Sequence, residues 1–252
     1  MATYQLRPMS LGEILDVAFA VYREYFATLA VIAVTCQGVP AVMATYIALG
    51  GGLIEHPFLW LGTVLLAGLG GLVAAGATVR VISQAYLGHE ASVGEALRYA
   101  AERITPLFVS GLAKYLLVFL ASLAFLIPGI IVACGYAVVA QAVVLEDPDA
   151  ATDALSRSWF LTKGHKGKAF VLGIVLGLIL MVPMMVLGMI AVFVPFLATT
   201  LQIGTQLLQI LAYPVVTSAL TLFYYDLRVR KEAFDLAYLS RQIGIELDTV
   251  GA

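Results

Sequence analysis

Three lysines and a histidine crowd into a short stretch between two long apolar segments. Lys163, His165, Lys166 and Lys168 all fall within TKGHKGK, residues 162–168. Ammonium groups at the end of an apolar segment suit the phosphates of anionic lipid headgroups, with ~1 kcal/mol of attraction per basic residue near a membrane surface. These four residues are therefore candidate contacts for lipid headgroups.

Three glutamines interrupt the last apolar segment. Gln202, Gln206 and Gln209 follow a spacing of four and then three residues, which places their amides on one face of a helix. Because a polar group in hydrocarbon must find a partner, we favour hydrogen bonds between helices, with Gln37 or Gln141 as partners. The alternative is that this intramembrane polar face lines the path of a solute.

Catalytic and metal-binding patterns are missing from the sequence. His56 is separated from His89 and His165 by predicted membrane spans, so the three imidazoles cannot form one zinc site. An acidic cluster follows the fourth apolar segment: Glu146, Asp147, Asp149 and Asp153. Pro148 and the lack of the EF-hand glycine make this cluster better suited to capping the next helix than to binding calcium. No Walker A, GxSxG or HExxH motif occurs, and we predict no enzyme, cofactor or metal.

The composition indicates the elements that position these groups. Hydrophobic residues make up 62% of the 252 residues and charged residues only 12%, about half the usual share. Long apolar runs between the few charged clusters are typical of a polytopic, all-α membrane protein, and we expect one integral membrane domain over residues 1–252. The net charge of −2 is uninformative by itself and implies no nucleic-acid partner, and we expect none.

Six apolar segments are long enough, or nearly so, to cross ~30 Å of hydrocarbon. They are residues 27–50, 57–79, 106–127, 128–145, 169–194 and 196–225. Tight turns are expected at Pro128 and Pro195, which interrupt uncharged runs, whereas Pro183 and Pro214 should lie inside helices and kink them.

The basic residues are distributed on one side of this topology. None of the 14 Lys and Arg residues lies in the three turns that follow the first, third and fifth segments. By the positive-inside rule, we expect a multi-pass protein with both termini in the cytoplasm.

An amphipathic helix precedes the first segment and is predicted to recur. In SLGEILDVAFAVYREYF, residues 10–26, Ser10 and Glu13 form a capping box and the apolar residues form one stripe. Residues 92–108 repeat this frame at an offset of 82, and a weaker copy begins at Ala150. Three repeats, about 10–80, 92–146 and 150–225, would each join an amphipathic helix to a helical hairpin, followed by a cytoplasmic tail, 226–252.

The role of these interfacial helices has three interpretations. They can be struts that cover the cytoplasmic ends of the spans, which we favour. They can bind anionic lipid together with the basic cluster, or they can bind a calmodulin-type or other peptide partner. A membrane protein and a second copy of the chain are further candidate partners of the protein. Residues 115–145 leave another alternative open, because two legs of about 15 residues reach only ~22 Å and would form a wedge in one leaflet.

Five blocks of the sequence resemble a known family. They are RPMSLGEILDVAFAVYREYF, SVGEAL, IPGII, VVLEDPDAATDALSRSWFLTKGH and FYYDLRVRKEAFDL, between residues 7 and 236. Together they resemble the prokaryotic membrane proteins grouped with the membrane domain of glycerophosphoryl diester phosphodiesterase. The resemblance implies a multi-helix inner-membrane protein of poorly defined activity. It does not imply an enzyme, because members with that activity use a separate barrel with an HRG motif that this chain lacks. Ala233 stands where the family pattern has glycine, a departure that concerns only a helix boundary.

We therefore expect a non-catalytic integral membrane protein that organises lipid or a partner protein through its cytoplasmic interfacial helices. One alternative is a component of a transporter for a small solute or lipid. Another is an accessory membrane subunit for lipid or glycerophosphodiester metabolism.

The predicted orientation can be tested with a reporter that functions only in the cytoplasm. Signal is expected when the reporter is fused after Ala252 and when it is inserted between Gly88 and Glu90, because the basic residues place both sites on the cytoplasmic side. A loss of signal at either site would contradict the six-segment topology.

Overall fold

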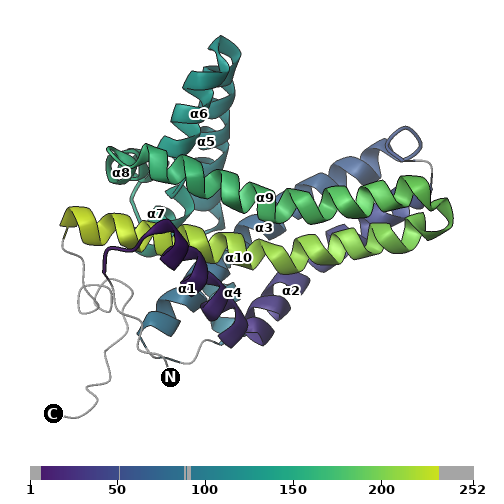
Figure 1. Ribbon diagram of the computed structural model, residues 1–252, viewed down its shortest axis with the longest axis horizontal. Coiled ribbons are helices and arrows are strands. Elements are labelled where there is room, and N and C mark those ends of the chain that lie inside the picture. The colour runs from purple at the N-terminus through teal and green to yellow at the C-terminus, as the bar shows by residue number, and fades with distance from the viewer. Residues whose placement is uncertain (1–6, 51, 88, 90–91, 233–252) are drawn as a thin grey trace.

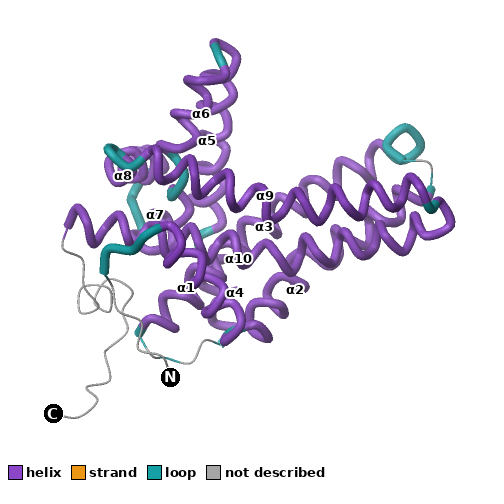
Figure 2. Tube along the Cα trace, viewed as in Figure 1, coloured by secondary structure: helices purple, strands orange, loops and turns teal. Residues whose placement is uncertain are grey.

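The computed structural model describes residues 7–50, 52–87, 89 and 92–232, and every regular element within these ranges is a helix (Figure 2). Six helical segments of this described part are long and apolar enough to cross a membrane. They are α2 (Phe26–Leu49), α3 (Pro57–Tyr86), α5 (Ile104–Ala124), the segment Leu126–Glu146, α9 (Lys166–Phe193) and α10 (Ala198–Glu232). The predicted all-α, polytopic membrane fold is confirmed.

The helices form two arms that diverge from a common base (Figure 1). Helices α2, α3, α9 and α10 run side by side in the longer arm, and the single turn η1 (Pro195–Leu197) joins the last two. Helix α5 and the short α6 (Leu126–Gly135) form a hairpin that projects in another direction. The base is completed by α1 (Leu11–Glu24), α4 (Val93–Glu102), α7 (Val139–Glu146) and α8 (Ala151–Thr162).

Helix α1 begins with the predicted capping box. The Ser10 hydroxyl accepts a hydrogen bond from the Glu13 amide (3.3 Å), and the Glu13 carboxylate accepts one from the Ser10 amide (2.7 Å). That bond from the Ser10 backbone, with a second from Arg7, lowers the pKa of Glu13 to about 2. Local sequence alone therefore defines the start of this helix.

The apolar stripe of α1 is divided between the protein and its surface. Ile14 and Ala18 are fully buried in the main core, whereas Phe19 is 41% exposed. The helix thus packs against the base, and one edge of its apolar stripe is exposed at the protein surface.

The second amphipathic helix departs from the predicted repeat. Helix α4 starts 82 residues after α1, but it ends at Glu102, before the repeat frame would end. Pro106 accounts for this, because a proline ring inside a continuing helix would clash with the carbonyl of Glu102. The Ser92 side chain makes no cap hydrogen bond, and the Glu95 carboxylate accepts a hydrogen bond from Gln84 on α3 (2.9 Å). The threefold repeat stays a prediction.

The fourth apolar segment is interrupted at residues 136–138, between α6 and α7. Two fully buried hydroxyls on α8 satisfy the backbone at this break. Ser158 and Thr162 both donate to the carbonyl of Gly135 (3.0 Å each), and Ser158 accepts from the amide of Val138 (3.4 Å). Because unpaired backbone groups are costly away from water, α8 is what permits the break.

The turn between α5 and α6 falls at Phe125 and not at Pro128. A proline is tolerated in the first turn of a helix, so α6 begins before Pro128 and contains it. The legs of the hairpin touch at Gly129, where a Cβ atom would come within 2.0 Å of the Ser122 hydroxyl. The turn at Pro195, and the positions of Pro183 and Pro214 inside α9 and α10, agree with prediction.

Helices α2 and α3 lie in close contact where a proline has freed a carbonyl. Pro40 lies inside α2 and cannot donate to the carbonyl of Cys36. A Cβ atom on Gly70 of α3 would come within 2.3 Å of that oxygen, so only glycine fits here. Weak Cα–H···O contact at such sites is common between packed helices.

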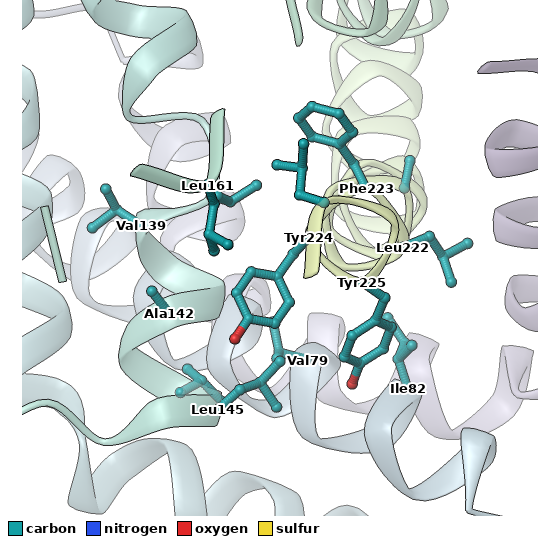
Figure 3. Packing of buried hydrophobic residues seen from close by; sticks show 14 of the residues in the cluster. Val79, Ile82, Val139, Ala142, Leu145, Leu161, Leu222, Phe223, Tyr224 and Tyr225 are labelled. Carbon is teal, nitrogen blue, oxygen red and sulfur yellow. The ribbon is translucent and has the colours of Figure 1, made fainter. Parts of the chain in front are cut away.

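The core lies at the base, around the last part of α10. Leu222, Phe223, Tyr224 and Tyr225 are fully buried there. Figure 3 shows these residues packed among side chains of α3, α7 and α8, including Ile82, Ala142 and Leu161. Helix α10 continues to Glu232, so residues 226–232 of the predicted tail are helical, and residues 233–252 lie outside the described residues.

The short second leg allows the wedge to be tested. Helix α6 has 10 residues and reaches ~15 Å, about half of the hydrocarbon thickness. Phe125→Cys, in a Cys36→Ala and Cys134→Ala background, should react slowly with a membrane-impermeant thiol reagent added outside. Phe125 is preferable to Gly129 because a side chain at Gly129 would meet Ser122.

Leu53→Cys in the same background is the positive control, since Leu53 lies in the turn between α2 and α3 and is 49% exposed. Equal labelling rates at Phe125→Cys and Leu53→Cys would show that the hairpin crosses the membrane.

Candidate functional site

The predicted basic cluster occupies the turn between α8 and α9. Lys163 follows the last residue of α8, and His165 precedes the first residue of α9. Gly164 between them has a φ of +84°, a left-handed conformation that suits glycine because it has no Cβ atom. This tight turn directs the four basic side chains into different surroundings.

Lys168 points into the protein. Its ammonium group donates to the Asp226 carboxylate (2.5 Å) and to the carbonyl of Met9 (2.6 Å). The Asp226 carboxylate is fully buried and also accepts the Met9 amide (2.7 Å) and Arg230 Nε (2.9 Å). Lys168 is thus held by an internal ion pair, and it differs in this respect from the exposed Lys163.

Lys166 stacks on an aromatic platform. Its Nζ atom lies 3.3 Å from the centre of the Trp159 ring, which is cation–π geometry. The Tyr136 ring lies 5.4 Å from the same indole. Gly135 of α6 also lies against this indole. A Cβ atom on Gly135 would come within 2.2 Å of the Trp159 ring, so glycine is required for the ring to fit.

A surface hollow of about 560 Å³ lies beside this platform. It is lined by Tyr136, Thr152, Leu155, Ser156, Trp159, Phe160 and Lys163. One ammonium group and three hydroxyl groups therefore surround an aromatic wall. Such a set can bind an anionic oxygen through charge and a neighbouring ester or hydroxyl through hydrogen bonds.

His165 is not among the residues that line the hollow. It is partly buried, and its Nδ1 atom has no hydrogen-bond partner within the described part of the chain. Lys163 therefore lines the hollow and Lys166 stacks on Trp159 of its wall, whereas His165 does not line the hollow and Lys168 pairs with Asp226.

Two of the three predicted glutamines face a second cavity, of about 350 Å³, inside the longer arm. Its polar lining consists of Gln37, Thr63, Gln206, Gln209 and Tyr213, and the rest is apolar. Gln37 lies on α2 and was one of the two expected partners of the glutamine face. Gln202 does not line this cavity, and the other expected partner, Gln141, is buried on α7 at the base.

The acidic cluster does not cap α8, and that prediction is wrong. The residue before α8 is Ala150, which makes no side-chain cap hydrogen bond. Glu146 instead accepts two hydrogen bonds from Arg157 Nε (2.6 and 2.9 Å), and Asp147 accepts one from Arg103 (2.8 Å). Glu146 and Asp147 of this cluster thus serve as partners for arginines of the neighbouring helices.

Sequence reasoning missed a charged network around Arg157. This residue also pairs with Glu232 of α10 (2.7 Å from Nη2 to Oε2), which in turn accepts from Arg228 (2.9 Å). Burial by itself lowers the pKa of Arg157, but hydrogen bonds to Glu232 and Glu146 outweigh it and raise the pKa above its ordinary value. The only signal in the sequence is the spacing of four between Arg228 and Glu232 on a helix that is otherwise apolar.

The fold and these sites define an all-helical, membrane-embedded protein with a polar base. Comparison of the chain with protein-family models, curated proteins and solved structures gives no match. Within the described residues, no group of three or more His, Cys, Asp or Glu side chains could hold a metal ion.

The Asp226 site predicts a large effect on stability. Asp226→Asn keeps the size of the side chain but leaves Lys168 and Arg230 without their shared negative charge. We expect the free energy of unfolding to fall by about 3 kcal/mol, as when one partner of a buried ion pair is removed. Thermal unfolding in detergent measures this change.

Glu102→Gln is the matched control, because it removes a surface ion pair with Arg98. The Arg98 side chain is 82% exposed and the Glu102 side chain is 56% exposed. Its effect should stay below about 1 kcal/mol. Similar unfolding temperatures for both variants would contradict the structural role of Asp226.

Proposed function

We propose that the protein is a non-catalytic membrane protein that organises anionic lipid at the cytoplasmic ends of its helices. The hollow beside Trp159 is the observation that carries this proposal. It combines the ammonium group of Lys163 with hydroxyl groups, and Lys166 lies on the same indole. This chemistry fits a phosphate-bearing headgroup better than it fits a neutral solute.

The position of the hollow supports a lipid as the ligand. It lies next to the first residue of α9, where an apolar helix begins, and Trp side chains are favoured at such interfaces. The hairpin α5–α6 adjoins it through Gly135 and Tyr136 and exposes apolar side chains such as Leu126, Ile127 and Ile131. Acyl chains of a lipid held in the hollow would lie along this hairpin.

The proposal also includes the orientation of the protein in the membrane and its relation to lipid metabolism. We place both termini in the cytoplasm and the protein in the inner membrane, on the support of the one-sided basic residues. The resemblance to the membrane domain of glycerophosphoryl diester phosphodiesterase supports a role close to lipid metabolism, as an organising or accessory component. A membrane protein partner or a second copy of the chain is a further proposal, for which the apolar surface of the hairpin leaves room.

The double variant Lys163→Gln, Lys166→Gln tests the headgroup site. Removing two ammonium groups at ~1 kcal/mol each should weaken binding of anionic lipid there about 30-fold at low salt. The ratio of anionic to zwitterionic lipid that copurifies from mixed membranes, measured by mass spectrometry, should fall. High salt should reproduce part of the loss in the unchanged protein.

Lys168 is left intact, since its change would break the buried pair with Asp226 and confuse stability with binding. Arg23→Gln, Arg98→Gln removes two positive charges from exposed positions and is the charge-matched control. An unchanged lipid ratio in the lysine variant, or an equal loss in the control, would overturn lipid recognition at this hollow.

A further inference from the structure

The cavity in the longer arm lies at hydrocarbon depth. Gln206 is roughly 12 Å from the start of α10, and Gln37 is roughly 16 Å from the start of α2, at 1.5 Å per residue. Both helices are long enough to cross the ~30 Å of hydrocarbon. Primary amides therefore line the cavity at a depth where bulk water does not satisfy their hydrogen-bonding groups.

These amides are only partly satisfied by the protein. Gln37 donates to the carbonyl of Ala67 (3.1 Å), and Gln209 donates to the weak acceptor Sδ of Met184 (3.3 Å). The Gln206 amide lines the cavity without a hydrogen bond to any described residue. A group with two donors and one acceptor thus faces the cavity, where an unpaired polar atom is costly.

The lining specifies the chemistry of a ligand. None of the described residues around the cavity is Asp, Glu, Lys or Arg, so an ion would have no counter-charge there. A hydroxyl group can both accept from an amide N–H and donate to an amide oxygen. The apolar remainder of the wall, which includes Pro40, Leu180 and Ile210, suits a hydrocarbon body.

We propose that this cavity binds an uncharged lipid that carries a free hydroxyl group. The exposed residues at its rim indicate entry from the membrane. Gln209 and Tyr213 of α10 are exposed. The apolar side chains Met181 and Met185 of α9 and Leu207 of α10 are exposed as well. At this depth the surrounding medium is hydrocarbon, which favours an amphiphile over a water-soluble solute.

Photolabelling of the purified protein with a diazirine-bearing hexadecanol tests the proposal. Gln206→Leu keeps a similar size but removes the unpaired amide, and labelling at low probe concentration should fall about tenfold. Gln202→Leu is the matched control, because it removes a glutamine from the same helix without touching the cavity. If Gln206→Leu fails to fold, as judged by size-exclusion chromatography, Gln206→Met replaces it.

Competition identifies the chemical group. Unlabelled hexadecanol should block labelling of the unchanged protein, whereas its methyl ether, palmitate and free glycerol should not. Equal blocking by the methyl ether would show an apolar cavity only, and blocking by palmitate or glycerol would indicate an anionic lipid or a small solute. Each of these three results, or equal labelling of the two leucine variants, would overturn the proposal.

This cavity and the hollow beside Trp159 are independent, because they share no lining residue. Loss of headgroup binding in the Lys163 and Lys166 variant should leave hexadecanol labelling unchanged.

Discussion

The buried carboxylate of Asp226 is the interaction on which the arrangement at the base depends. A fully desolvated carboxylate is tolerated only when charge and hydrogen bonds surround it, and this one has Lys168, Arg230 and the backbone amide of Met9. These partners come from α9, from α10 itself and from the segment before α1. One ion thus draws three parts of the chain to a single point, and the longer arm starts from there.

Helix α8 carries out the second structural task at the base. One side of it supplies Ser158 and Thr162, which satisfy the backbone where the fourth apolar segment is broken. The adjacent residue Trp159 lines the hollow, as does Lys163 directly after the helix. The break is therefore not separable from the candidate site, because the same helix that redirects the hairpin also places an indole and a lysine beside it.

Features that depend on neighbours in sequence were predictable, and those that depend on distant partners were not. Apolar runs indicated all six helical segments, and the Ser10 capping box is local. The same motif at Ser92 makes no side-chain cap hydrogen bond, and its Glu95 carboxylate pairs with Gln84 of another helix. Likewise, nothing close to Lys168 in the sequence indicates that Asp226, 58 residues later, removes it from the surface.

The candidate sites show the same division. Helical periodicity placed Gln206 and Gln209 on one face, and both line the cavity. Periodicity could not show that Gln202, on the same face, does not line the cavity, because other helices complete the cavity wall. The break at residues 136–138 was not predictable either, since the hydroxyls that satisfy its backbone come from α8.

Helix α10 links the two regions, and their chemistry differs because their surroundings differ. Its charged side chains begin at Asp226, at the base, while the part within the arm carries only neutral amides and hydroxyls. Pro214 lies in α10 between the base and the cavity. It removes the backbone hydrogen bond that the carbonyl of the cavity residue Ile210 would otherwise accept. Tyr22 of α1 donates to the adjacent carbonyl of Leu211 (2.9 Å). Helix α1 therefore holds α10 beside the cavity, at the turn where Pro214 interrupts the backbone hydrogen bonding of α10.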